Sequence, residues 1–244
     1  TQASQVLRLL RVALRANPAI PSHQLRFRLG TAHTFDGHSA GFALRSDAAW
    51  DLGLGEKLVE YAQSQPVATG LLNPTTDIEK KADLATRWME RACFTGESLI
   101  ALLYLFFALE SLLGDKSEKL KAHDLAFRQG MLSHVATGGF THPNTTWFLY
   151  DQVRSAAVHG EDVPEVGWDV VKRFTRVVSE ALDQYITLAS TEGITKRGKL
   201  LTFLKAHPDR PEFIEWLHEH GGSAWTKYLQ KITGGSEEEC NPSH

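Results

Sequence analysis

A run of almost uninterrupted apolar residues limits most strongly the folds that this chain can adopt. The segment "SLIALLYLFFALESLLG" occupies residues 98–114, and residues 99–109 are apolar almost all round a helical projection. A helix needs roughly 20 apolar residues to cross a membrane, so this run is too short to span one. The segment is therefore expected to form a central helix that other helices bury on every side.

The sequence around this run predicts further helices. Ser98 is a candidate N-cap of the central helix, and Gly114 marks its end. Upstream, Thr76 and Glu79 have the spacing of a capping box, which predicts that another helix begins there. Further helices are predicted at about 117–135 with Ser117 as N-cap, around Arg154, at about 166–188, near 195–206 and near 210–220.

The pattern before residue 76 differs from this helical pattern. Residues 5–16 have helical periodicity, whereas residues 25–29 alternate like a half-buried strand, and "FDGH" at 35–38 is typical of a turn towards a second strand. The chain is thus predicted to be mainly α. A small N-terminal α/β segment covers residues 1–75, a helical bundle 76–190, and a C-terminal helical extension with a polar tail 191–244.

Composition excludes several functional classes. The chain of 244 residues has two cysteines, too few for a disulfide framework or a thiolate zinc site, and we expect neither a metal nor a cofactor. A net charge of −3 argues against a protein that coats nucleic acid by charge alone. Because no basic stretch followed by an apolar run opens the sequence, no signal peptide and no membrane partner are expected, and the predicted location is cytoplasmic.

One arginine stands among apolar residues on a predicted helix. In "LYDQVRSAAVHGED", residues 149–162, Arg154 lies between Val153 and a run of small apolar residues. His159 follows five residues later, and Gly160 is placed to end the helix in the left-handed conformation. On an ideal helix of ~100° per residue, Arg154 and His159 lie ~140° apart, so they share no face of a regular helix.

Arginine and histidine at a helix end are suited to one reaction in particular. Arginine presents a fixed fork of donors to a phosphate, and histidine exchanges protons near neutral pH. The C-terminal end of a helix favours the imidazolium form, which suits a general acid. Together they can cleave RNA without a metal: the ribose 2′-OH attacks, Arg154 holds the phosphate and His159 protonates the leaving 5′ oxygen. A structural explanation stays open, in which Arg154 pairs with Asp151 or Glu110 and His159 only interacts with the helix end.

Two segments resemble the HEPN superfamily, and specifically its ApeA-like group. They are "ALESLLG" at 108–114 and "FLYDQVRSAAVHGED" at 148–162. The family signature is an Arg followed after four to six residues by a His, late in a helical bundle, and Arg154 and His159 match it. The ApeA-like pattern is matched by Tyr150, Arg154, Ser155, His159 and Gly160. The resemblance covers roughly residues 76–190.

The resemblance implies a bundle of four or five helices that forms a homodimer, in which two such motifs face each other in a composite active site. Members of the family act as metal-independent ribonucleases in antiphage defence and toxin systems, so RNA, and an antitoxin or activating partner, are the implied partners. Arg154 and His159 would be catalytic, and Glu110 would orient Arg154. Tyr150, Asp151 and Ser155 would support the site, Ser155 standing where many members have Asn, Asp or His.

Two non-catalytic hypotheses remain beside the ribonuclease. Some HEPN domains resemble RNA or nucleotide sensors, or partners of a nucleotidyltransferase, that keep the fold without cleavage. A purely structural oligomerisation bundle is the other hypothesis. A basic cleft around Arg154 would favour RNA, a small closed pocket would favour a mononucleotide, and pairing of Arg154 with Asp151 on an open surface would favour the scaffold.

Overall fold

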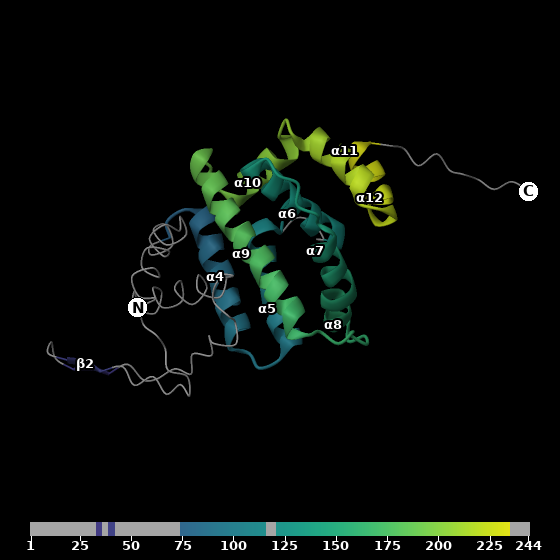
Figure 1. Ribbon diagram of the computed structural model, residues 1–244. Coiled ribbons are helices and arrows are strands. Elements are labelled where there is room, and N and C mark those ends of the chain that lie inside the picture. Colours follow the sequence, from purple (N-terminus) through teal and green to yellow (C-terminus); the bar gives the residue numbers. More distant parts are fainter. Residues whose placement is uncertain (1–32, 36–38, 42–73, 116–120, 235–244) are drawn as a thin grey trace, which may run out of the picture.

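The computed structural model describes residues 33–35, 39–41, 74–115 and 121–234, and this part of the chain is mainly helical, as predicted (Figure 1). Its elements are β1 (His33–Phe35), β2 (Ser39–Gly41), α4 (Asp77–Phe94), α5 (Ser98–Leu113), α6 (Ala122–Thr137), α7 (Asn144–Leu149), the π-helix η2 (Tyr150–Ser155), α8 (Ala156–His159), α9 (Trp168–Thr191), α10 (Arg197–Ala206), α11 (Arg210–His220) and α12 (Ser223–Thr233).

The two short strands flank the turn that the sequence predicts. β1 and β2 pair antiparallel, with His33 opposite Gly41 and Phe35 opposite Ser39. The hairpin expected around residues 35–38 is therefore present, although with strands of three residues each. The helix predicted at 5–16 and the strand predicted at 25–29 lie outside the described residues.

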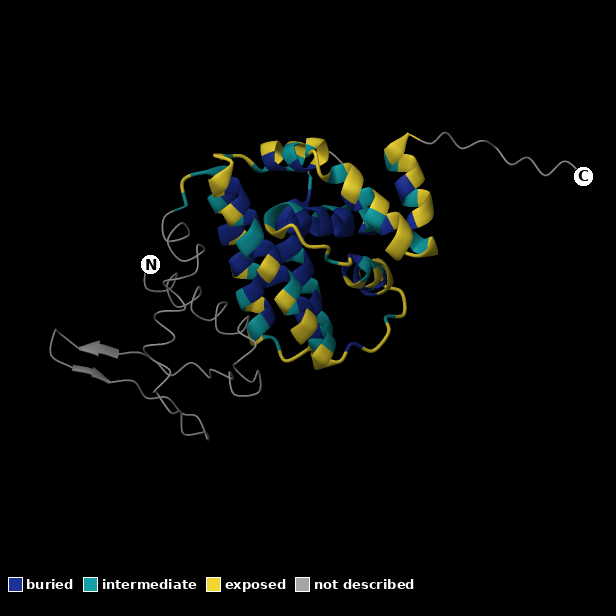
Figure 2. Cartoon of the chain, turned by 45° about the horizontal axis from the view of Figure 1, so that its top comes forward, coloured by how far each residue is buried: buried dark blue, intermediate teal, exposed yellow. Residues whose placement is uncertain are grey.

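The apolar helix α5 lies at the centre of the bundle, as predicted, but the described residues do not bury it on every side, since Leu103, Tyr104 and Phe107 are only half-buried. Its side chains Leu102, Leu105 and Leu109 are fully buried. Helices α4, α6 and α9 and the π-helix η2 contact it, and the buried surfaces of these helices face the interior (Figure 2). In the described part of the chain, no helix combines the length and the apolar character that a membrane span requires.

The ends of α5 differ from the prediction in one detail. Ser98 is not the N-cap but the first helical residue, after Glu97. Its hydroxyl donates a hydrogen bond of 2.6 Å to the carbonyl oxygen of Val166, just before α9, and so joins two helices instead of capping one. Gly114 does end the helix, with its N–H donating to the carbonyl oxygen of Glu110. Its φ of −72° means that the end does not require glycine's left-handed freedom.

The capping box at the start of α4 is confirmed. The side chain of Thr76 accepts a hydrogen bond from the backbone N–H of Glu79, and the Glu79 carboxylate accepts one of 2.8 Å from the N–H of Thr76. The same carboxylate accepts a further bond from the N–H of Thr75. These bonds satisfy N–H groups that a helix start otherwise leaves without partners.

The structure differs from the sequence prediction at the start of α6 and in the presence of α12. Helix α6 begins at Ala122, and the proposed cap Ser117 lies outside the described residues. A third helix of the C-terminal extension, α12, was not predicted, because Gly222 before it supplies no side-chain cap and the turn offers little pattern. Burial rather than capping holds α12: Trp225 is fully buried, and the indole N–H donates a hydrogen bond of 2.5 Å to the side-chain oxygen of Asn144.

The C-terminal extension is anchored on the helices that lead to the Arg154 segment. The imidazole Nε2 of His123, in α6, lies 2.9 Å from the carbonyl oxygen of Ala224. The imidazole Nε2 of His142, just before α7, lies 2.8 Å from the carbonyl oxygen of His220. Because α7 runs directly into η2, the extension fixes the start of the segment that bears Arg154.

Replacing Thr76 by alanine should lower the free energy of unfolding by about 1 kcal/mol, the typical contribution of a side-chain N-cap. Urea denaturation measures this change, and the slope against urea concentration should not change because the exposed surface is the same. Thr76→Ser, which keeps the hydroxyl, is the matched control. A serine variant as unstable as the alanine variant would show that the methyl group, not the cap, stabilises α4.

The same cap predicts a dependence on pH. The hydrogen bond from the backbone of Thr76 is the main cause that lowers the pKa of Glu79 in the folded chain. Its stabilising contribution is therefore present above the unfolded value of about 4.3 and is lost as the pH falls through the lowered folded value. Glu79→Gln should make the acid side of the stability curve less steep.

Candidate functional site

The helix that carries the Arg–His motif is not a regular α-helix. Residues 150–155 form the π-helix η2, between the α-helical turns α7 and α8. The ideal spacing of ~100° per residue therefore does not apply here, and the separation of ~140° predicted for Arg154 and His159 is wrong as a description of this segment. Short π-helical turns inside α-helices occur frequently at functional sites.

Arg154 pairs with Glu110 and not with Asp151. Its Nη2 atom lies 3.1 Å from the Oε1 atom of Glu110 on the central helix, and the two side chains are 21% and 22% exposed. Asp151 is exposed, and its carboxylate accepts a hydrogen bond from the side chain of Gln152. Of the two pairings that the sequence left open, the structure thus contains the one that joins the motif to α5.

Tyr150 forms the other wall around the guanidinium group. The Cζ atom of Arg154 lies 4.9 Å from the centre of the Tyr150 ring, within the range of a cation–π interaction. The ring is 6% exposed and lies edge-on to Phe106 of α5, with 5.3 Å between centroids. Burial of the phenol, and next the charge of Glu110, raise its pKa to about 12, against the opposing effect of Arg154. Tyr150 therefore stays neutral and supplies a flat, uncharged surface.

This arrangement uses only part of the hydrogen-bonding capacity of Arg154. Within the described part of the chain, the buried Nε atom has no hydrogen-bond partner, and neither does the buried Oε1 of Glu110, whose contact with Arg154 is an ion pair without good hydrogen-bond geometry. A bidentate pair would engage two guanidinium nitrogens in parallel bonds. Glu110 and Tyr150 therefore fix the position of the cation, and an anion could reach only the part of its side chain that is exposed.

His159 lies at the exposed C-terminal end of α8. Gly160 follows it in the left-handed conformation, with φ of +73°, as the sequence predicts. The N–H groups of Gly160 and Glu161 both donate to the carbonyl oxygen of Ala156 and close the helix end. No hydrogen bond or ion pair joins the imidazole of His159 to the described part of the chain, so it is accessible to a substrate or to a second protein copy.

Two large apolar side chains near the motif face the solvent. Phe148, in α7, and Val158, directly before His159, are each 53% exposed. The helix ends directly after Val158 and His159, which leaves Val158 uncovered. Trp147 lies against His123, with ring centroids 5.2 Å apart. Ser155 is only partly buried and caps no helix through its side chain.

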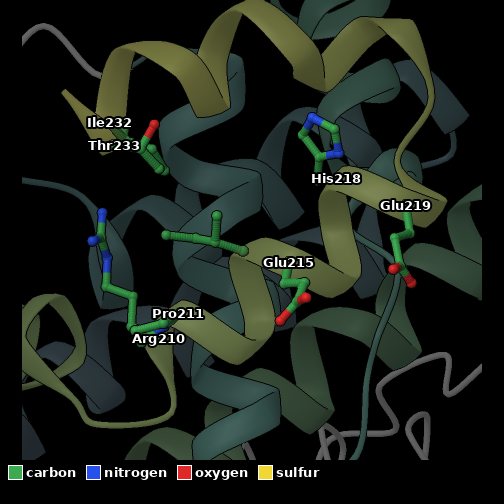
Figure 3. A pocket seen from close by; sticks show the side chains of 8 residues that line it. Arg210, Pro211, Glu215, His218, Glu219, Ile232 and Thr233 are labelled. Atoms are coloured by element: carbon green, nitrogen blue, oxygen red, sulfur yellow. The ribbon is translucent and has the colours of Figure 1, made fainter. Parts of the chain in front are cut away.

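A separate hollow of roughly 690 Å³ lies between α11 and α12 (Figure 3). Arg210 stands at one end of it and His218 with Glu219 at the other. None of the residues of the Arg–His motif lines this hollow, so it is no extension of the site around Arg154. The described residues contain no group of three or more His, Cys, Asp or Glu side chains arranged to hold a metal ion.

Comparisons with family models, with curated proteins and with solved structures give no match for this chain. What the site can do must therefore be argued from its own geometry. A positioned guanidinium group with unused donors can bind a phosphate, and an exposed imidazole at a helix end can exchange a proton.

A double-mutant cycle should measure the interaction between Glu110 and Arg154. We expect a coupling energy of about 1–2 kcal/mol from Glu110→Gln, Arg154→Gln and the double variant, because the pair is shielded more than a surface pair, which contributes up to about 1 kcal/mol. Thermal or urea unfolding supplies the four free energies. The control cycle with Asp151→Asn should give almost no coupling. A larger coupling for Asp151 than for Glu110 would contradict the pairing described above.

Proposed function

We propose that this protein is a metal-independent endoribonuclease in which Arg154 binds the scissile phosphate and His159 acts as general acid and base. The observation that carries the proposal is the position of Arg154. Glu110 and Tyr150 hold it half-buried with donors unused, five residues before an exposed histidine at a helix end. The resemblance of "YDQVRSAAVHG" to the HEPN motif supports the same assignment.

The proposed reaction needs no group other than these side chains and the RNA itself. The 2′ oxygen attacks the phosphorus atom while the bond to the 5′ oxygen breaks. The proton of the 2′-OH passes to a neutral imidazole, and an imidazolium gives a proton to the leaving 5′ oxygen. Arg154 neutralises the charge that develops on the phosphate oxygens. The products are a 2′,3′-cyclic phosphate and a 5′-OH end, and DNA is no substrate because it lacks the 2′-OH.

A homodimer would supply both forms of the imidazole. One His159 can act as the base while His159 of a second copy acts as the acid, which is a division of labour that a single copy does not offer. The exposed side chains of Phe148 and Val158 lie on the segment that carries the motif, and large uncovered apolar groups are typical of protein interfaces. In the proposed dimer these two residues lie at the interface beside the composite site.

The alternative function is that of an RNA- or nucleotide-binding module without catalysis. One observation favours it: nothing in the described part of a single copy orients the imidazole of His159. Binding by Arg154 alone would need no oriented imidazole. A role as an effector in antiphage defence or as a toxin with an antitoxin partner rests on the family resemblance and belongs to the same proposal.

Cleavage of RNA by purified protein in EDTA tests the proposal. We expect 5′-labelled RNA to be cut to fragments with 2′,3′-cyclic phosphate ends. His159→Ala should lower the rate by at least 100-fold, because proton transfer by a positioned group contributes about 10²–10⁴-fold. His218→Ala is the matched control, since His218 is also exposed and lies in the last turn of a helix. Arg154→Lys keeps the charge but loses the fork, and should also be slow.

Three outcomes would contradict the proposal in different ways. Equal rates for the wild type and His159→Ala would remove His159 from the reaction. Cleavage that stops in EDTA would point to a metal-dependent mechanism. RNA binding that depends on Arg154 without any cleavage, in any buffer, would favour the binding module.

The dimer makes a prediction of its own. Val158→Glu should convert a dimer to a monomer in light scattering coupled to size-exclusion chromatography, because it places a charge in an apolar interface. The cleavage rate should fall in parallel and recover as the protein concentration is raised. Leu84→Glu is the control, since Leu84 is an exposed apolar residue on α4, away from the motif. A wild-type protein that is monomeric at all concentrations would overturn the composite site.

A further inference from the structure

The first half of α9 carries three exposed cations that form no ion pair with the residues that the structure describes. Lys172, Arg173 and Arg176, here called the α9 strip, are all exposed. No ion pair joins any of them to a carboxylate of the residues that the structure describes. Lys172 and Arg176 stand four residues apart, a spacing at which like charges repel each other, while Asp169 and Glu180 stand one turn before Arg173 and one turn after Arg176.

The α9 strip lies on the side of the helix that faces away from the core. Phe174, fully buried, marks the inner side, and Lys172 and Arg176 project roughly 160° away from it on a regular helix. Arg173 projects roughly 100° away, towards one flank. That flank is the one nearest α6, because Gln184, roughly 20° from Arg173 on the same projection, donates a hydrogen bond to Ser133 of α6.

The first half of α9 and the Arg154 segment pack against the same side chain of α5. Phe174, the neighbour of Arg173 in the chain, lies 4.5 Å from Phe106 of α5 between ring centroids. Phe106 in turn lies 5.3 Å from the Tyr150 ring, above which Arg154 is held. The loop 160–167 leads directly from His159 to the start of α9, so eight residues separate His159 from the helix that carries the strip (Figure 1).

Trp168 adds an aromatic surface to the strip. It is the first residue of α9, is 40% exposed, and stands four residues before Lys172 and eight before Arg176. Residues at this spacing lie on neighbouring positions of one helix face. Cations that follow the backbone together with an aromatic ring on which a base can stack are the combination by which proteins bind single-stranded nucleic acid.

Acidic residues restrict the direction of such a strand. Asp169 lies one turn before the strip and Glu180 one turn after Arg176, and both are exposed. With Asp169 counted, the segment 168–176 carries three cations and one anion, a net charge of +2. Glu161, Asp162 and Glu165 make the preceding loop acidic, so phosphates would avoid the loop and pass along the flank of α9 instead.

We propose that the α9 strip binds the backbone phosphates of single-stranded RNA whose scissile bond lies at Arg154, with Trp168 stacking on one base. The strip thus extends the substrate site beyond the Arg–His motif, and this inference rests on the proposed ribonuclease function. It assigns the substrate class as single-stranded RNA, because the exposed Trp168 ring can stack only on a base that is not paired.

Binding of a short fluorescent single-stranded RNA, measured by anisotropy at several salt concentrations, tests the proposal. His159→Ala serves as the background in all proteins, so that cleavage does not interfere. Changing Lys172, Arg173 and Arg176 together to Gln should make the slope of log K against log salt less steep by about 2, since each phosphate contact of a single strand contributes about 0.7. The affinity at about 0.1 M salt should fall on the order of 100-fold.

The matched control changes Lys205, Lys227 and Lys231 to Gln, which removes the same charge from exposed positions on α10 and α12. It should alter the affinity less than threefold. Trp168→Ala should weaken binding about 10-fold without changing the salt slope, because stacking releases no counterions. Circular dichroism confirms that each variant is folded.

Equal losses in the strip variant and the control would overturn the strip, since only the net charge would then matter. Unchanged RNA affinity together with lost binding of poly-glutamate would assign the strip to an acidic protein partner and overturn the RNA proposal. Strip-dependent binding, together with no cleavage by the protein that keeps His159, would support the strip and contradict the ribonuclease function. Cleavage by the protein that keeps His159, together with RNA binding that does not depend on the strip, would support the ribonuclease function and overturn the strip.

Discussion

The burial of α5 is the constraint on which the rest of the structure depends. This helix has no continuous polar face, so α4, α6, α9 and the motif segment must all cover it. Near its C-terminal end, however, it carries Glu110, and a carboxylate at the edge of a core is unstable unless a cation compensates it. The segment that covers this end of α5 therefore has to supply a cation, and Arg154 is that cation. The position of the site follows from the need to bury α5.

The π-helical turn η2 lies in the segment that makes two different contacts with α5, one through Tyr150 and one through Arg154. Tyr150 must bury its ring against Phe106, and Arg154 must reach Glu110 from the same segment. A π-turn alters the angular spacing of the residues that follow it, and the few π-turns found inside α-helices are frequently at functional sites. The turn is retained here where the ring and the guanidinium group are both brought to α5.

The sequence predicted the parts of the fold that depend on local patterns. Two such features are the apolar run of residues 99–109 and the capping box of Thr76 and Glu79. In both, the interactions that form the structure involve residues that are close together in the sequence. The π-turn and α12 have no comparable local signal, since both are held by distant contacts such as the bond between Trp225 and Asn144. Ser98 failed as a predicted cap for the same reason: a carbonyl 68 residues away binds its hydroxyl.

The candidate site, too, was predictable only in part. The sequence predicted the residue types and the glycine that ends the helix. It did not decide whether Arg154 pairs with Glu110 or with Asp151, because one pair is possible across a bundle and the other along a regular helix. The exposure of Phe148 and Val158 was likewise not predictable, because it depends on which other helices lie next to these residues in the folded chain. The positive charges of Lys172, Arg173 and Arg176 can be read from the sequence. Their orientation away from the core, however, follows only from the packing of α9 in the structure.

The partial burial of the Arg154–Glu110 pair is compatible with the proposed binding of a phosphate beside Glu110. At 21% and 22% exposure, the two side chains are shielded enough that their attraction holds the guanidinium group in place when no phosphate is bound. Full burial would leave no part of the guanidinium group for a phosphate to contact, and full exposure would leave Arg154 free to adopt many rotamers. In the proposed function, the phosphate would meet the exposed part of the Arg154 side chain beside Glu110, while Tyr150 limits the rotation of the group.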